Sequence, residues 1–135
     1  MDARLADILA SFIEKIVPVY REKLKSIVLF GSCARGTYTE DSDIDLFLVM
    51  DIDENKVRDM ADSMDEKTYE VNDAYDVLIS PVLATLSKFS KYGDSMPLYI
   101  NIKREGMVIY ERGRKVKIQH GKQLWNDGGC HSYIF

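Results

Sequence analysis

Two short apolar segments separated by a polar one constrain the fold of this chain most. The segments are "SIVLF" (26–30) and "DIDLFLVM" (43–50), both rich in leucine, β-branched and aromatic residues. A short apolar run bounded by turn-forming residues is typical of a strand that is buried in a sheet. The sequence therefore predicts two buried strands that are joined by residues 31–42.

Helical periodicity beside these strands indicates that helices cover the sheet. Apolar residues recur at helical spacing over 5–16, so we expect a helix that Asp2 caps and that ends before Pro18. A second helix is expected over 53–69, with Asp53 as its cap. The remaining predicted elements are a strand at 75–82 that stops at Pro81, a helical segment at 83–92 and a strand at 106–111. This order predicts an α/β (α+β) fold, a small mixed sheet packed with helices.

Length and composition exclude several classes of protein. The 135 residues suffice for one domain with one core. No apolar run is long enough to cross a bilayer, and no secretory leader is recognisable, so we expect a cytoplasmic protein without a membrane role. The spacing of Cys33 and Cys130 suggests neither a disulfide framework nor a zinc site. A pI of about 5.2 disfavours direct nucleic-acid binding.

The turn after the first strand has the residues of a phosphate-binding loop. Gly31 lets the backbone approach an anion closely, and the hydroxyl of Ser32 and the N–H groups that follow can donate to phosphate oxygens. Taken alone, this dipeptide is equally compatible with an ordinary turn that carries a capping serine.

The second strand begins with two alternating carboxylates. Because strand side chains alternate, Asp43 and Asp45 point to the same face, about 7 Å apart. Two carboxylates on one strand suit Mg²⁺, which takes one or two carboxylates together with substrate phosphates. A solvated strand end is the alternative for an isolated Asp-x-Asp. Together with the Gly-Ser turn, the pair predicts a site for a magnesium-bound nucleoside triphosphate.

Gly31-Ser32, ten intervening residues and Asp43-Ile44-Asp45 resemble the signature of the nucleotidyltransferase superfamily, which shares the DNA polymerase beta fold. The string "GSCARGTYTEDSDIDLFLV" is similar to the minimal nucleotidyltransferases, which are often encoded beside HEPN-domain proteins as antitoxins. The resemblance covers residues 3–112. We therefore expect a nucleotidyltransferase domain over 1–112 and a C-terminal tail over 113–135.

The resemblance implies a third carboxylate on a later strand, which would help to bind a second metal ion and accept a proton. Asp76, at the start of "YDVLIS", is the best match, and Asp73 is the rival. Arg35 would neutralise charge on the leaving pyrophosphate, unless it is only a surface residue. Ser42 stands among the nucleotide-binding candidates, although it fits an ordering role in its loop better.

The function implied is Mg²⁺-dependent transfer of AMP from ATP to a tyrosine hydroxyl of a HEPN-type toxin. Asp43, Asp45 and Asp76 would hold two Mg²⁺ ions, while Gly31 and Ser32 bind the phosphates. One alternative is an antitoxin that neutralises its partner by binding alone. Another is transfer to a small molecule such as an aminoglycoside, although a chain of this size has little room for a separate acceptor domain.

Overall fold

The computed structural model describes residues 3–37, 39, 41–113, 123–126 and 129–132. Its centre is a four-stranded sheet in the order β3-β2-β1-β4. β1 pairs antiparallel with both β2 and β4, and β2 pairs parallel with β3. In chain order, the elements of this unit are α1 (Ala3–Tyr20), β1 (Leu24–Phe30), α2 (Ser32–Arg35), β2 (Ile44–Met50), α3 (Val57–Tyr75), β3 (Ile79–Thr85), α4 (Leu86–Tyr92), α5 (Pro97–Glu105) and β4 (Met107–Glu111). The predicted mixed sheet with helices is confirmed.

Two 3-10 helices and a separate pair of strands complete the described secondary structure. Short 3-10 helices at Arg21–Lys23 and Glu54–Lys56 precede β1 and α3. Near the C-terminus, β5 (Gln123–Asn126) and β6 (Gly129–Ser132) form an antiparallel pair that is separate from the main sheet. The division of the chain at residue 112 stays a prediction.

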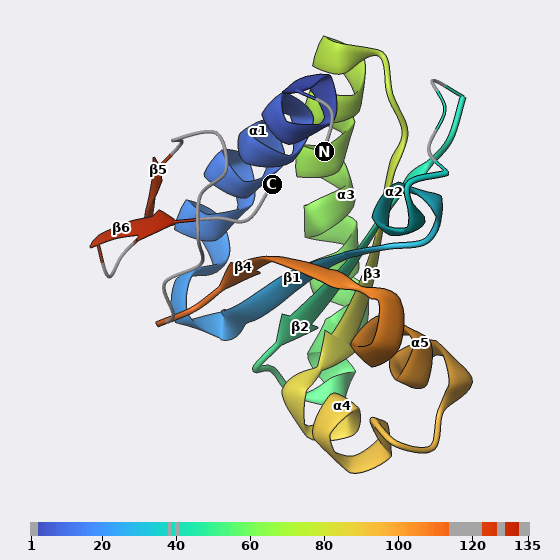
Figure 1. Ribbon diagram of the computed structural model, residues 1–135. Coiled ribbons are helices and arrows are strands. Elements are labelled where there is room, and N and C mark those ends of the chain that lie inside the picture. Colours follow the sequence, from blue (N-terminus) through green and yellow to red (C-terminus); the bar gives the residue numbers. More distant parts are fainter. Residues whose placement is uncertain (1–2, 38, 40, 114–122, 127–128, 133–135) are drawn as a thin grey trace.

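The helices α1 and α3 lie side by side and cover one face of the sheet (Figure 1). The apolar side of α1 is fully buried from Leu5 to Tyr20. It packs against alternate residues of the strands, including Ile27, Leu29 and Leu46. This core forms because apolar residues recur about every 3.6 positions in the helix and every second position in the strands, so each element has one apolar face.

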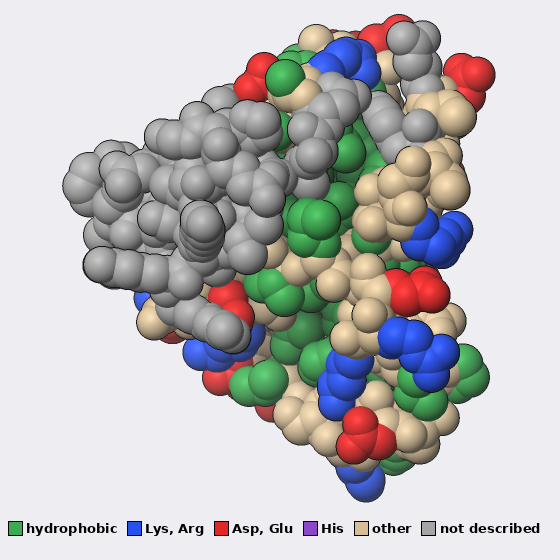
Figure 2. All heavy atoms as spheres, in the orientation of Figure 1, with side chains coloured by type: hydrophobic (Ala, Val, Ile, Leu, Met, Phe, Trp, Pro, Cys, Tyr) green, Lys and Arg blue, Asp and Glu red, His purple; other side chains and the backbone are tan. Residues whose placement is uncertain are grey.

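The helices α4 and α5 cover only part of the opposite face. Phe47 of β2 is fully buried there, with its ring centroid 5.3 Å from that of Phe89 and 5.6 Å from that of Tyr99. The last turn of α5 carries the basic residues Lys103 and Arg104. Figure 2 shows several cationic side chains on the same part of the molecule. Asp45 is two residues before Phe47 on the same face of β2, and it is only half-buried.

Two predicted boundaries in the first helices are wrong. The helix α1 continues through Pro18 to Tyr20, because Val17 and Tyr20 are buried and the Tyr20 hydroxyl lies 2.9 Å from Ser63 Oγ. This packing offsets the missing Pro18 N–H near the helix end. Asp53 makes no side-chain capping bond, and α3 runs on to Tyr75 because Val71 extends its buried stripe. The proposed cap at Asp2 lies outside the described residues.

The third strand is also displaced from its predicted position. β3 spans Ile79–Thr85 and passes through Pro81. Proline is tolerated because β3 is an edge strand, where one side of the backbone needs no ladder partner. The helix α4 begins at Leu86, three residues later than the sequence predicts, and the sequence analysis did not predict α5. None of the described helices is long and apolar enough to cross a membrane.

Candidate functional site

The candidate site lies on the uncovered part of the sheet, where β2 begins. Asp45 is in register with Phe30 of β1 on one side and Ser80 of β3 on the other. Ile44 and Leu46 point into the core beneath α1 and α3, so alternation places Asp43 and Asp45 together on the opposite face. The predicted pairing of the two carboxylates on one face is therefore what the fold produces.

Gly31 connects β1 to α2 directly beside Asp45. Its φ of 73° and ψ of −152° are accessible to glycine but strained for other residues. A Cβ atom at this position would collide with the Asp45 carboxylate. Glycine is therefore required here for two reasons. The turn has a positive φ, and the Asp45 carboxylate occupies the space in which a side chain would lie.

Ser32 begins the single turn of helix that follows Gly31. Its carbonyl accepts the N–H of Thr37 at 3.0 Å, and the Arg35 N–H donates to Gly31 O at 3.1 Å. The first N–H groups of a helix have no acceptor within the helix, so they can donate to an external anion. The Gly31-Ser32 turn thus stands next to the carboxylates, as the sequence predicts for phosphates bridged to a metal.

The charges of the site act on Asp45. Burial and the neighbouring Asp43 carboxylate raise the pKa of Asp45, while the Arg35 guanidinium opposes this. Arg35 is exposed, and its Nη1 lies 3.8 Å from Glu105 Oε2. A cation bound beside Asp45 would favour the ionised form of this carboxylate.

Cys33 is buried behind the carboxylates. Its thiol donates to the backbone oxygen of Asp43 at 3.6 Å. Burial raises the pKa of Cys33 to about 11, with a further contribution from the negative charge of Asp45. The thiol is therefore neutral near pH 7 and supports the loop without acting as a nucleophile.

Ser42 orders the loop before β2. Its hydroxyl accepts the Thr39 N–H at 3.0 Å and lies 3.1 Å from Thr39 Oγ1, while the Ser42 N–H donates to Thr39 O. These bonds close a turn that leads into Asp43.

The candidates for a third carboxylate do not lie on β3. Asp76 ends α3 in the left-handed conformation, three residues before the strand, and Asp73 lies within α3, not in the loop expected for it. Both are exposed. In the part of the chain that the structure describes, no three His, Cys, Asp or Glu side chains are grouped so that they could hold a metal ion. The residue beside Asp45 on β3 is Ser80. The sequence analysis missed it because the pattern within one strand does not show how that strand is aligned with its neighbour.

Asp43 and Asp45 themselves fit a magnesium ion. They offer hard carboxylate oxygens at the start of β2 and repel each other, and Asp45 faces a backbone turn that has no side chain at Gly31. Mg²⁺ commonly binds through one or two carboxylates and the phosphates of its substrate. The pair therefore suits a metal ion that arrives with a triphosphate.

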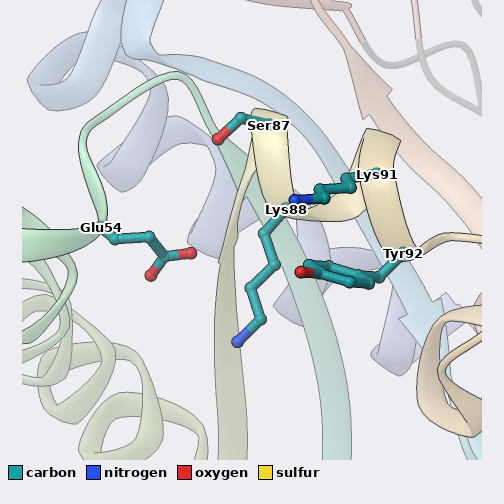
Figure 3. Close-up of a pocket in the computed structure, with 5 residues that line it drawn as sticks. All are labelled: Glu54, Ser87, Lys88, Lys91 and Tyr92. Carbon is teal, nitrogen blue, oxygen red and sulfur yellow. The ribbon is translucent and has the colours of Figure 1, made fainter.

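A cavity of about 330 Å³ lies elsewhere. It is lined by residues that follow the carboxyl ends of β2 and β3, namely Glu54, Ser87, Lys88, Lys91 and Tyr92 (Figure 3). Since Asp43 and Asp45 are at the amino end of β2, this cavity belongs to the opposite end of the sheet.

Comparison with known proteins places the chain in a family. A family model described as "Nucleotidyltransferase domain" matches residues 10–110, which contain the Gly31 turn and both carboxylates. The chain belongs to the nucleotidyltransferase domain family. The resemblance seen in the sequence is confirmed, and the protein is a nucleotidyltransferase.

Curated relatives of this nucleotidyltransferase come from Methanocaldococcus jannaschii. "Putative protein adenylyltransferase MJ0604" is 35% identical over 99 residues, which cover 73% of this chain and 91% of the relative. "Putative protein adenylyltransferase MJ1305" is 35% identical over 114 residues, which cover 80% of this chain and 73% of the relative.

Two solved structures share a distant likeness with the nucleotidyltransferase. "Crystal structure of the toxin-antitoxin with AMP-PNP" has 19% identity and a TM-score of 0.48. The match covers 79% of this chain and 73% of the chain in that structure. A crystal structure of the toxin-antitoxin MntA-HpeT in a mutant form has 20% identity and a TM-score of 0.46. The match covers 80% of this chain and 73% of the chain in that structure.

Proposed function

We propose that this nucleotidyltransferase transfers AMP from Mg²⁺-bound ATP to a tyrosine hydroxyl of a HEPN-type toxin and so acts as its antitoxin. The observation that carries the proposal is the close packing of the Gly31 turn against Asp45. A glycine turn at this position supports phosphate binding beside the carboxylates. The names of the curated relatives support protein as the acceptor. The likeness of residues 31–49 to the minimal nucleotidyltransferases supports a HEPN partner.

In the proposed reaction, the phenolic oxygen attacks the α-phosphorus of ATP. A new O–P bond forms, the bond from the α-phosphorus to the bridging oxygen breaks, and pyrophosphate leaves. Mg²⁺, when bound by Asp43 and Asp45, would polarise the α-phosphate and balance the developing negative charge. Ser32 and Arg35 would hold the departing phosphates.

The proton of the phenol needs an acceptor, and Asp76 is the proposed one. Asp76 stands two residues before Leu78, whose carbonyl accepts the N–H of Ile44 at 2.8 Å. It therefore lies at the same end of the sheet as Asp43, where β2 and β3 begin. Asp73 is one helical turn earlier and is the alternative.

The test uses a HEPN-type protein that co-purifies with this chain as the candidate acceptor. After incubation with ATP and Mg²⁺, we expect the intact mass of that protein to increase by one adenylyl group for each tyrosine modified. The double variant Asp43→Asn, Asp45→Asn should leave the mass unchanged. In a parallel thermal melt, Mg²⁺ with ATP at a hundred times its Kd should stabilise the wild-type protein by about 2.7 kcal/mol. Absence of both effects would refute the proposal.

Neutralisation by binding alone is the second candidate. The observation that favours it is the absence, among the described side chains, of a third carboxylate grouped with Asp43 and Asp45. If the double variant neutralises the toxin as well as wild type does, and neither protein adds mass, binding alone is the mechanism.

A further inference from the structure

The edge strand β3 presents uncovered side chains next to the carboxylates. Ser80 lies beside Asp45, and Val82 lies beside the buried Phe47. Leu78 precedes Ile79, which points into the core, so alternation places Leu78 on the same face as Ser80. Leu78 is 54% and Val82 37% exposed, although both are apolar. We call Leu78, Ser80 and Val82 the β3 strip.

The strand order decides what this strip faces. The Gly31 turn follows β1, Asp45 is on β2 with Asp43 directly before that strand, and the β3 strip is on the far side of β2 from the turn. In an in-line displacement, the attacking oxygen approaches opposite the leaving group. With the pyrophosphate on the side of the Gly31 turn, in-line attack would come from the β3 side of Asp45.

We propose that the β3 strip is the acceptor subsite, and that it receives a tyrosine side chain of a partner protein. This inference rests on the function proposed above and names the residues that would select the acceptor. The strip has an apolar residue on each side of a hydroxyl, with the carboxylates next to it. A phenol ring has an apolar body for Leu78 and Val82 and a polar tip that can reach the reacting phosphate. A serine or threonine acceptor has no comparable body to bind.

The backbone of β3 favours a side chain over an added strand as the occupant. In this parallel ladder, the N–H groups of residues 80 and 82 point toward β2, and those of 79 and 81 point to the open edge. The N–H of Ile79 already donates to Asn72 Oδ1 at 2.8 Å, and Pro81 has none. This part of the edge is therefore closed to strand addition, while the side chains beside it are accessible.

The experiment follows the Leu and Val methyl groups by NMR. The protein is saturated with Mg²⁺ and AMP-PNP, and N-acetyl-L-tyrosinamide is added, with N-acetyl-L-serinamide as the comparison. We expect ring-current shifts of the Leu78 and Val82 methyl signals with the tyrosine compound only. Leu98, which is 38% exposed on α5, is the internal control and should not move.

Two variants test the contacts directly. Leu78→Asn and Val82→Thr should each raise the apparent Kd for N-acetyl-L-tyrosinamide about five- to tenfold, since each removes apolar contact with the ring. Leu98→Asn should leave it unchanged, and all three variants should still bind AMP-PNP. If AMP-PNP binds but the Leu78 and Val82 signals do not shift, or shift equally with the serine compound, the acceptor subsite is refuted and the donor site stands. If AMP-PNP fails to bind the wild-type protein, both the proposed AMP transfer and the acceptor subsite are refuted.

Discussion

Gly31 and Asp45 occupy adjoining space so closely that a methyl group on Gly31 would overlap the Asp45 carboxylate. The two residues are fourteen positions apart in the sequence, and the antiparallel pairing of Phe30 with Asp45 brings them together. The conformation of the turn and the position of the Asp45 carboxylate, which we propose to bind the metal ion, are thus coupled.

This coupling predicts the effect of Gly31→Ala. The substitution strains a backbone with φ of 73° and displaces Asp45, so we expect a loss of about 1–3 kcal/mol in the free energy of unfolding. The stabilisation by Mg²⁺ and ATP should disappear as well. Gly36→Ala is the matched control, because Gly36 also has positive φ but has no atom near its missing Cβ. Equal loss of ligand response in both variants would show that the coupling to Asp45 is not the cause.

The raised pKa of Asp45 predicts a pH dependence of the metal-free protein. Between the ordinary value of 3.8 and its raised pKa, the folded state binds more protons at Asp45 than the unfolded state does. This contribution to stability is therefore largest below pH 3.8 and is lost as the pH rises through the raised pKa.

Asp45→Asn should remove this dependence and give a higher Tm than wild type near pH 7 in the presence of EDTA. Thermal melts from pH 4 to 7 measure it, with Asp41→Asn, an exposed position in the preceding loop, as the control. A variant with a lower Tm than wild type at pH 7 would contradict the electrostatic interpretation.

The role of the third carboxylate predicts a difference between Asp76→Asn and Asp73→Asn. If Asp76 accepts the phenolic proton, its substitution should lower the rate of AMP transfer by roughly 10²-fold or more and leave most of the ATP affinity. Asp73→Asn should retain the wild-type rate. Single-turnover transfer and a separate ATP titration distinguish the two steps, and the reverse result would assign the proton to Asp73.

The aromatic cluster beside the site predicts a large effect of Phe47→Ala on stability. Phe47, Phe89 and Tyr99 have ring centroids 5.2–5.6 Å apart, and Phe47 is fully buried. We expect a loss of about 3–5 kcal/mol in the free energy of unfolding, measured by urea denaturation. Tyr69→Ala, at a side chain that is 69% exposed on α3, should change it by less than about 0.5 kcal/mol.

The sequence by itself determined the local parts of this protein. Asp43 and Asp45 share a face because strand side chains alternate, and that period is already present in the sequence. The spacing from Gly31 to Asp43 made the family recognisable, and the buried face of α1 follows from its helical period. Each of these depends on residues that are close together along the chain.

Only the tertiary structure decided what surrounds the two carboxylates. Ser80 lies beside Asp45, and Asp76 ends a helix instead of entering a strand, because α3 extends along its buried stripe to Tyr75 and the parallel pairing of β2 with β3 fixes the register. Packing of α4 and α5 on Phe47 leaves the carboxylates uncovered. Contacts between residues far apart in the chain set these positions, and the pattern within a single segment does not contain them.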